Sequence, residues 1–176
     1  MRYTLNAGTL YSEPSSGPLA KIKSSLLGPV KKIYLQDDEP MLKSDICNLK
    51  DTDKPQGDVR SRLYILIDRE NHRVAEAHPG YAEGDDPEVA GWPICRLPRV
   101  DHAQVLIQGI VYTLTMHNSQ NYSLLDEKDC EILRIMHRGI CGGWVSADSP
   151  GLEPPIICGL FIFCRYMEQE NEFLVV

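Results

Sequence analysis

The sequence predicts a mainly β protein, in which a closed antiparallel β-barrel surrounds a central hydrophobic C-terminal α-helix. Two observations lead to this prediction. Short apolar runs with strand-type residues recur along most of the chain between turn-type residues, which is typical of antiparallel sheet structure. The C-terminal stretch then has no polar side chain from Ile156 to Cys164, so every face of it must be covered by protein.

Strand candidates follow from Tyr-x-Leu triplets that repeat weakly along the chain and from the apolar runs after them. The triplets are residues 3–5, 64–66 and 112–114, and the apolar runs are residues 19–22, 74–77 and 132–136. We interpret each unit as a strand, a turn and a returning strand, because turn-type residues occupy positions 68–71 and 126–129. Further strand candidates are residues 32–35, 41–46, 105–108, 122–125 and 144–147.

Two stretches have too much turn chemistry for regular structure. Residues 48–61 are polar and contain Pro55 and Gly57, which predicts an exposed loop. Residues 79–98 are rich in glycine, proline and aspartate. Loops of this length in a compact domain are often functional or mobile.

The apolar C-terminal stretch is predicted to be a helix over residues 155–172. Pro155 suits the first turn of a helix, because proline lacks the N–H that would be unpaired there. Length favours a helix over a buried strand, and the expected helix is about 27 Å long. Its apolar part is about half of the roughly 20 residues that span a bilayer, so no transmembrane segment is expected.

A barrel accommodates both the strands and the helix. Closure removes the exposed strand edges that an open sheet would present. The lumen of a barrel of about ten or more strands is too wide for its own side chains to fill, and an apolar helix can occupy it. We therefore expect residues 1–176 to form a single domain.

These features resemble the tubby C-terminal-like superfamily, which includes the tubby domain, the LURP-one-related proteins and the phospholipid scramblases. The Tyr-x-Leu units and the apolar terminal helix carry the resemblance, which spans nearly the whole chain. It implies a closed barrel of about twelve antiparallel strands around the helix. The chain is most similar to small bacterial LURP-one-related proteins, because it lacks the acylated cysteine clusters and the longer membrane-associated helix of scramblases.

Charge narrows the choice of partner. The formal net charge of −7 disfavours a general nucleic-acid binder, which needs a surface rich in lysine and arginine. Tubby domains bind phosphoinositide head groups through a basic pocket, whereas this chain is acidic and offers only a few lysines for such a contact. An anionic lipid or a protein is the expected partner. Candidate ligand-binding residues are Lys21, Lys23, Lys31 and Lys32, with Lys43 as a further cation. The favoured function is a non-enzymatic binding or scaffold protein.

The alternative is an enzyme or small-ligand-binding protein that uses a polar cluster at the barrel rim. Its candidate residues are Arg96, Arg99, Asp101, His102 and His117. Asp101 would orient the imidazole of His102, and one of the arginines would hold an anion. The same residues would also serve simply to cap strands and to satisfy backbone groups at the rim.

No catalytic residue, metal site or cofactor is predicted. The five histidines form neither His-x-His nor His-Glu-x-x-His, and the six cysteines form no Cys-x-x-Cys pair. Cys141 lies among glycines near His137, but glycines at a barrel corner are explained more simply as bends. Commonly used hydrolase, phosphate-loop and dinucleotide motifs are not found in the sequence.

Two further expectations concern location and the end of the helix. The first residues have no apolar core of a signal peptide, so we expect a cytoplasmic protein with reduced cysteines.

Charged residues of the last helical turns are expected to pair with arginines at the barrel rim. The expected set comprises Arg165, Glu168, Glu170 and Glu172 on the helix, and Arg96, Arg99 and Arg138 on the rim. The sequence predicts no oligomeric state.

Overall fold

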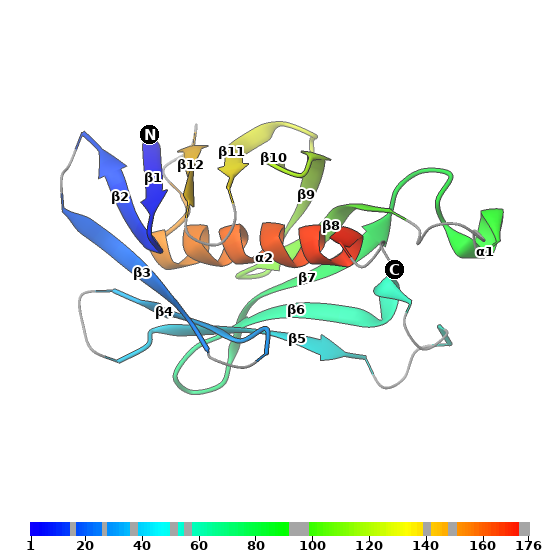
Figure 1. Cartoon of the computed structure of the whole chain (residues 1–176), viewed down its shortest axis with the longest axis horizontal. Helices are drawn as coiled ribbons and strands as arrows, with labels where there is room; N and C mark the ends of the chain where they lie inside the picture. Colours follow the sequence, from blue (N-terminus) through cyan, green and yellow to red (C-terminus); the bar gives the residue numbers. More distant parts are fainter. Residues whose placement is uncertain are drawn as a thin grey trace.

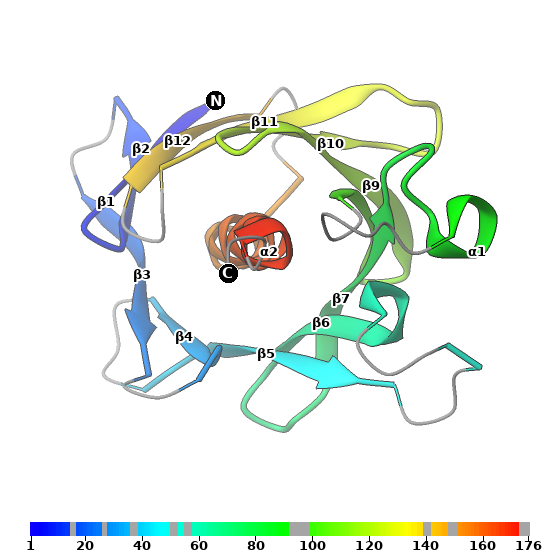
Figure 2. The same cartoon turned by 45° about the vertical axis from the view of Figure 1, so that its right-hand side comes forward.

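The computed structural model describes residues 1–14, 17–25, 28–35, 39–49, 53–54, 58–91, 99–138, 142–147 and 151–172. Within these residues, twelve antiparallel strands form a closed barrel in the order β1-β12-β11-β10-β9-β8-β7-β6-β5-β4-β3-β2 (Figure 2). The first six strands are β1 Arg2–Asn6, β2 Thr9–Glu13, β3 Pro18–Ser24, β4 Lys31–Tyr34, β5 Leu42–Asn48 and β6 Arg62–Ile67. The others are β7 Arg73–Tyr81, β8 Val100–Ile107, β9 Ile110–Asn118, β10 Asn121–Leu125, β11 Glu131–His137 and β12 Gly142–Ala147. The predicted fold class is confirmed.

Helix α2, Pro154–Glu172, runs through the barrel and is enclosed by the strands (Figures 1 and 2). It begins one residue before the predicted start and ends where expected. Every side chain from position 155 to position 164 is buried, and so are Tyr166 and Met167. The Phe163 and Tyr166 rings pack against Tyr64 of β6, with ring centroids 6.0 and 5.3 Å apart. In the described part of the chain, no helix has the length and apolarity needed to cross a membrane.

Alternation along each strand separates a lumen face from an outer face. On β3, Ala20 and Ile22 are buried against the helix, while Lys21 between them and Lys23 after them point outward. Gly159 lets the helix approach the barrel wall closely, because a side chain at this position would collide with the buried Leu66 of β6. The lumen is therefore filled by packed side chains from both elements.

The hairpin units expected from the Tyr-x-Leu triplets are only partly correct. The unit at residues 64–66 is confirmed, because β6 pairs directly with β7. In the first unit, however, β2 returns from β1, and residues 19–22 belong to β3, which pairs with β2. In the third unit, β10 lies between β9 and β11. The apolar runs are strands as predicted, but for two of them the predicted partner strand was wrong.

The two stretches expected to be irregular contain short regular elements. A 3-10 helix, η1, covers Val59–Ser61, and helix α1 covers Pro87–Ala90. The expectation of an exposed loop is wrong at Asp58 and Val59, which are both buried. Arg60 explains this burial, because its guanidinium pairs with Asp58 at 2.7 Å and with Asp86 at 2.9 Å. Burial acts to raise the pKa of Asp58, but hydrogen bonds from Arg60 outweigh it and lower the pKa.

Charged residues at the end of α2 pair differently from the expectation. Arg165 binds Glu168 at 2.8 Å and Glu172 at 2.5 Å within the helix itself. Glu170 pairs with Arg62 of β6. Arg62 was not among the expected rim partners, because the pairing depends on the register of a distant strand. Arg96, one of those expected partners, lies outside the described residues.

Candidate functional site

Because helix α2 fills the lumen, candidate ligand-binding residues have to be sought on the outer face and at the ends of the barrel. The predicted lysines lie on three neighbouring strands, β3, β4 and β5. Lys23 pairs in register with Lys32, and Lys32 pairs with Lys43. Their neighbours Ile22 and Ile33 point into the lumen, so the three lysines point outward. We call Lys23, Lys32 and Lys43 the lysine row.

The lysine row has no carboxylate partner in the part of the chain that the structure describes. Lys21 is exposed on the same face, two positions before Lys23. Among the described residues, no carboxylate pairs with any of these four lysines, and the Lys23 ammonium lies 4.3 Å from the Tyr34 ring centroid. Like charges directly opposite one another destabilise a sheet. The row therefore costs stability and leaves its positive charges available to a partner.

Lys31 does not belong to this surface. It pairs in register with Ser44, whose buried hydroxyl lies 2.8 Å from the Tyr166 hydroxyl of the helix. Burial and the nearby Arg165 lower the pKa of Lys31, as expected for an ammonium turned toward the lumen. The sequence alone could have separated Lys31 from Lys32, because adjacent residues of a strand point to opposite faces of the sheet.

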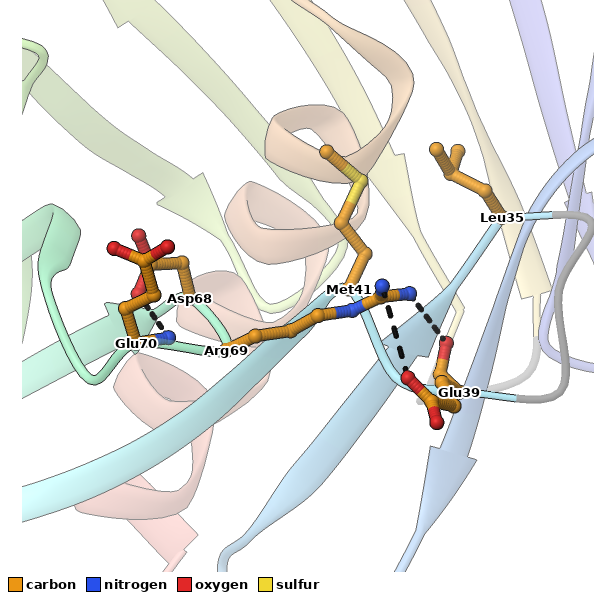
Figure 3. A pocket seen from close by; sticks show the side chains of 6 residues that line it. All are labelled: Leu35, Glu39, Met41, Asp68, Arg69 and Glu70. Atoms are coloured by element: carbon orange, nitrogen blue, oxygen red, sulfur yellow. Dashed lines mark hydrogen bonds and ion pairs between the residues drawn. The ribbon is translucent and has the colours of Figure 1, made fainter.

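A hollow of about 420 Å³ lies beside the lysine row, at the turns that follow β4 and β6 (Figure 3). Figure 3 shows the Arg69 side chain extended toward Glu39. The Arg69 Nε donates to the Pro40 carbonyl at 3.1 Å, and its Nη1 lies 3.7 Å from the Glu39 carboxylate. A second hollow of about 480 Å³ shares Met41 and Arg69 and continues to Lys32 and Lys43. Basic, acidic and apolar side chains therefore meet at this end of the row, since Glu39, Asp68 and Glu70 also line the first hollow.

Part of the alternative rim cluster is brought together. The Asp101 carboxylate lies 2.7 Å from His102 Nδ1 and 3.7 Å from Arg99 Nη2. The His102 ring lies against Gly80 of β7, where any side chain would overlap the imidazole. Arg96 lies outside the described residues.

His117 belongs to a separate polar chain on β9, β10 and β11. Its Nε2 lies 2.9 Å from the buried Ser123 hydroxyl, which donates to the Glu131 carboxylate at 2.5 Å. The same carboxylate binds Arg134 at 2.9 Å. Burial acts to raise the pKa of Glu131, but the hydrogen bonds from Ser123 and Arg134 lower it. Ser123 therefore gives its proton to a carboxylate, unlike a nucleophilic serine, which gives it to histidine.

Sequence reasoning missed Ser123, Glu131 and Arg134, because a β-bulge in the β10–β11 pair determines how they meet.

Within the described ranges, no group of three or more histidine, cysteine, aspartate or glutamate residues is placed to hold a metal ion. Comparisons with protein-family models, with curated proteins and with solved structures found no match, so function has to be inferred from the geometry of these residues.

Proposed function

We propose that this protein is a cytoplasmic, non-enzymatic, tubby-like barrel that binds anionic lipid surfaces through the lysine row and Lys21. The observation that supports the proposal most is the direct register of Lys23, Lys32 and Lys43 across three strands without carboxylate partners among the described residues. A sheet that tolerates two repulsive cross-strand pairs has a destabilising feature that a bound anionic surface would relieve.

The energy available to this surface is sufficient for reversible membrane binding. A lysine near an anionic leaflet contributes about 1 kcal/mol, so four lysines contribute about 4 kcal/mol. The overall charge of −7 opposes approach, so binding depends on the local arrangement of the lysines. Exposed charges are screened beyond about 10 Å at 0.1 M salt, and the interaction should therefore weaken as salt is added.

Apolar side chains beside the row favour a lipid surface over other polyanions. Leu35 follows β4 and is 39% exposed. It lines the same hollow as Met41, next to the cavity that reaches Lys32 and Lys43. Basic residues that flank an exposed apolar group are suited to the boundary between head groups and acyl chains.

The test is co-sedimentation with vesicles of phosphatidylserine and phosphatidylcholine, with pure phosphatidylcholine vesicles as reference. Lys32→Glu removes one attractive charge and adds a repulsive one at the centre of the row. It should weaken binding by about 2 kcal/mol, or roughly thirtyfold. Lys128→Glu is the matched control, because it makes the same change of charge at an exposed turn between β10 and β11.

The same Lys32→Glu variant should be more stable than the wild type. It converts two repulsive cross-strand pairs into attractive ones, which is expected to raise the free energy of unfolding by about 1 kcal/mol. Urea denaturation measures this change and separates lost binding from misfolding. Absence of binding to anionic vesicles at low salt, or equal weakening by Lys128→Glu, would contradict the proposal.

A further inference from the structure

A second polar row crosses the outer face on the other side of the barrel. Arg2 of β1 pairs in register with Ser146 of β12, and Ser146 pairs with Arg134 of β11. Val145 and Ile135 beside them point into the lumen, so this row points outward. Figure 2 shows β11 and β12 across the barrel from β4 and β5, which carry part of the lysine row.

The row lines a hollow of about 410 Å³, whose other lining residues are Glu131, Leu133 and Trp144. Two contacts position the guanidinium groups. The Arg2 guanidinium carbon lies 5.3 Å from the centroid of the Trp144 ring, and Arg134 Nη2 lies 2.9 Å from Glu131. Glu131 is fixed in turn by the buried Ser123 hydroxyl. Side chains held in this way lose less conformational entropy when a ligand binds.

Several hydrogen-bond donors at this hollow are unused within the described residues. Among the described carboxylates, Arg2 approaches only Glu13, and its Nε lies 3.7 Å from the Glu13 oxygen, which is longer than a hydrogen bond. Arg134 contacts Glu131 through Nη2, and its Nε and Nη1 groups have no partner among the described residues. The Ser146 hydroxyl also makes no hydrogen bond to described residues. A guanidinium has five N–H donors, arranged to match carboxylate and phosphate oxygens.

We propose that this hollow binds the oxyanion group of a small ligand, a carboxylate or a phosphate monoester, between Arg2 and Arg134 with Ser146 at its base. Two cross-strand steps separate the arginine Cα atoms by about 10 Å, so both long side chains reach the space above Ser146. Glu13 and Glu131 keep the surroundings close to neutral, which favours one oxyanion over an extended polyanionic surface. This site is independent of the lysine row.

Trp144 provides a direct signal for occupancy. Because the chain has two tryptophans, Trp92→Phe leaves Trp144 as the sole source of indole fluorescence. Inorganic phosphate and acetate are titrated separately at constant ionic strength, with chloride as the balancing anion. At least one of them should produce a saturable change in emission. If Trp92→Phe impairs folding, the indole N–H resonance of Trp144 in the wild type gives the same information by NMR.

Substitutions of Arg2 and Arg134 test whether the anion binds at this hollow. Arg2→Gln and Arg134→Gln should each weaken binding of the responsive anion by about tenfold or more, because each removes charge-assisted hydrogen bonds. Arg73→Gln is the matched control, since Arg73 is also an outward strand arginine that pairs with a glutamate three positions away, at 3.0 Å. The arginine variants should leave vesicle binding unchanged.

The two anions distinguish the two sources of the ligand group. Saturation by phosphate alone identifies a phosphate monoester, saturation by acetate alone identifies a carboxylate, and saturation by both indicates a general oxyanion site; each supports the proposal. A linear, non-saturating response to both anions would overturn it. Equal weakening by Arg73→Gln and Arg134→Gln would also overturn it, because the effect would then be one of total charge.

Discussion

Phe163→Ala is expected to lower the free energy of unfolding by about 4 kcal/mol. Phe163 is completely buried at the centre of α2, and its ring packs against Tyr64 of the barrel and Tyr166 of the helix. Truncation removes a large apolar side chain and leaves a cavity that the closed barrel cannot collapse to fill. Urea denaturation followed by circular dichroism measures the loss.

Val89→Ala is the control for this measurement. Val89 in α1 is 87% exposed, so its truncation should change the free energy of unfolding by less than about 0.5 kcal/mol. A loss below about 1 kcal/mol for Phe163→Ala would show that the ring is not packed between helix and barrel.

Acidification from about pH 7 to about pH 5 is expected to reduce stability by about 2 kcal/mol through His137. His137 at the end of β11 is buried between Tyr122 and Phe161, with ring centroids 6.2 and 5.7 Å away. Burial lowers the pKa of His137 from 6.5 to about 4, and the nearby Arg165 adds to this shift. A weaker interaction with the Phe161 backbone opposes it.

The loss of stability at low pH follows from the difference in proton binding between the unfolded and the folded state. Between about pH 6.5 and about pH 4, the unfolded chain takes up a proton on His137 that the folded protein does not bind, so stability falls as pH falls. Glu168 lies 3.7 Å from His137 Nδ1, but it is already paired with Arg165 at 2.8 Å. A charged imidazole would therefore gain little from this carboxylate.

His137→Phe should remove most of this pH dependence, because the phenyl ring is apolar and does not titrate. His72→Phe serves as the control, since the His72 side chain is 70% exposed. Three carboxyl groups with lowered pKa values, Asp58, Asp68 and Glu131, do not account for this change, because they lose their contribution to stability only below their ordinary values of 3.8 to 4.5. Equal stability of the wild type at about pH 7 and about pH 5 would contradict the assignment to His137.

Most of the fold could be predicted because it depends on local pattern. The apolar run that begins at Ile156 is too long for a typical strand and too short for a membrane span, so it had to be an enclosed helix. Strand β2 was missed because Leu10 is its single buried residue, which leaves no apolar run to recognise. The hairpin partner expected for β3 was wrong because β2 was missed, whereas β10 was predicted as a strand at residues 122–125 but was not placed between β9 and β11.

The candidate sites were harder to predict, because they depend on register between strands. Nothing local shows that Lys43 lies directly opposite Lys32, or that Ser146 lies between Arg2 and Arg134. The two-residue period of a strand did separate Lys31 from Lys32, and it could have been used to divide the basic residues between faces. The other features of the candidate sites depend on contacts between strands that are distant in the sequence.

Placement of every proposed site on the outer face depends on a lumen that is filled by α2. Cys158 and Cys164 of the helix test this directly, because both are completely buried, whereas Cys130 is exposed. Burial also raises the pKa of Cys158 to about 12, so little thiolate forms at neutral pH. Native protein is treated with iodoacetamide, and peptide mass spectrometry reads each thiol separately. We expect rapid labelling of Cys130 and protection of Cys158 and Cys164 until urea unfolds the chain; labelling of the helix thiols at the rate of Cys130 in the native protein would contradict an enclosed helix.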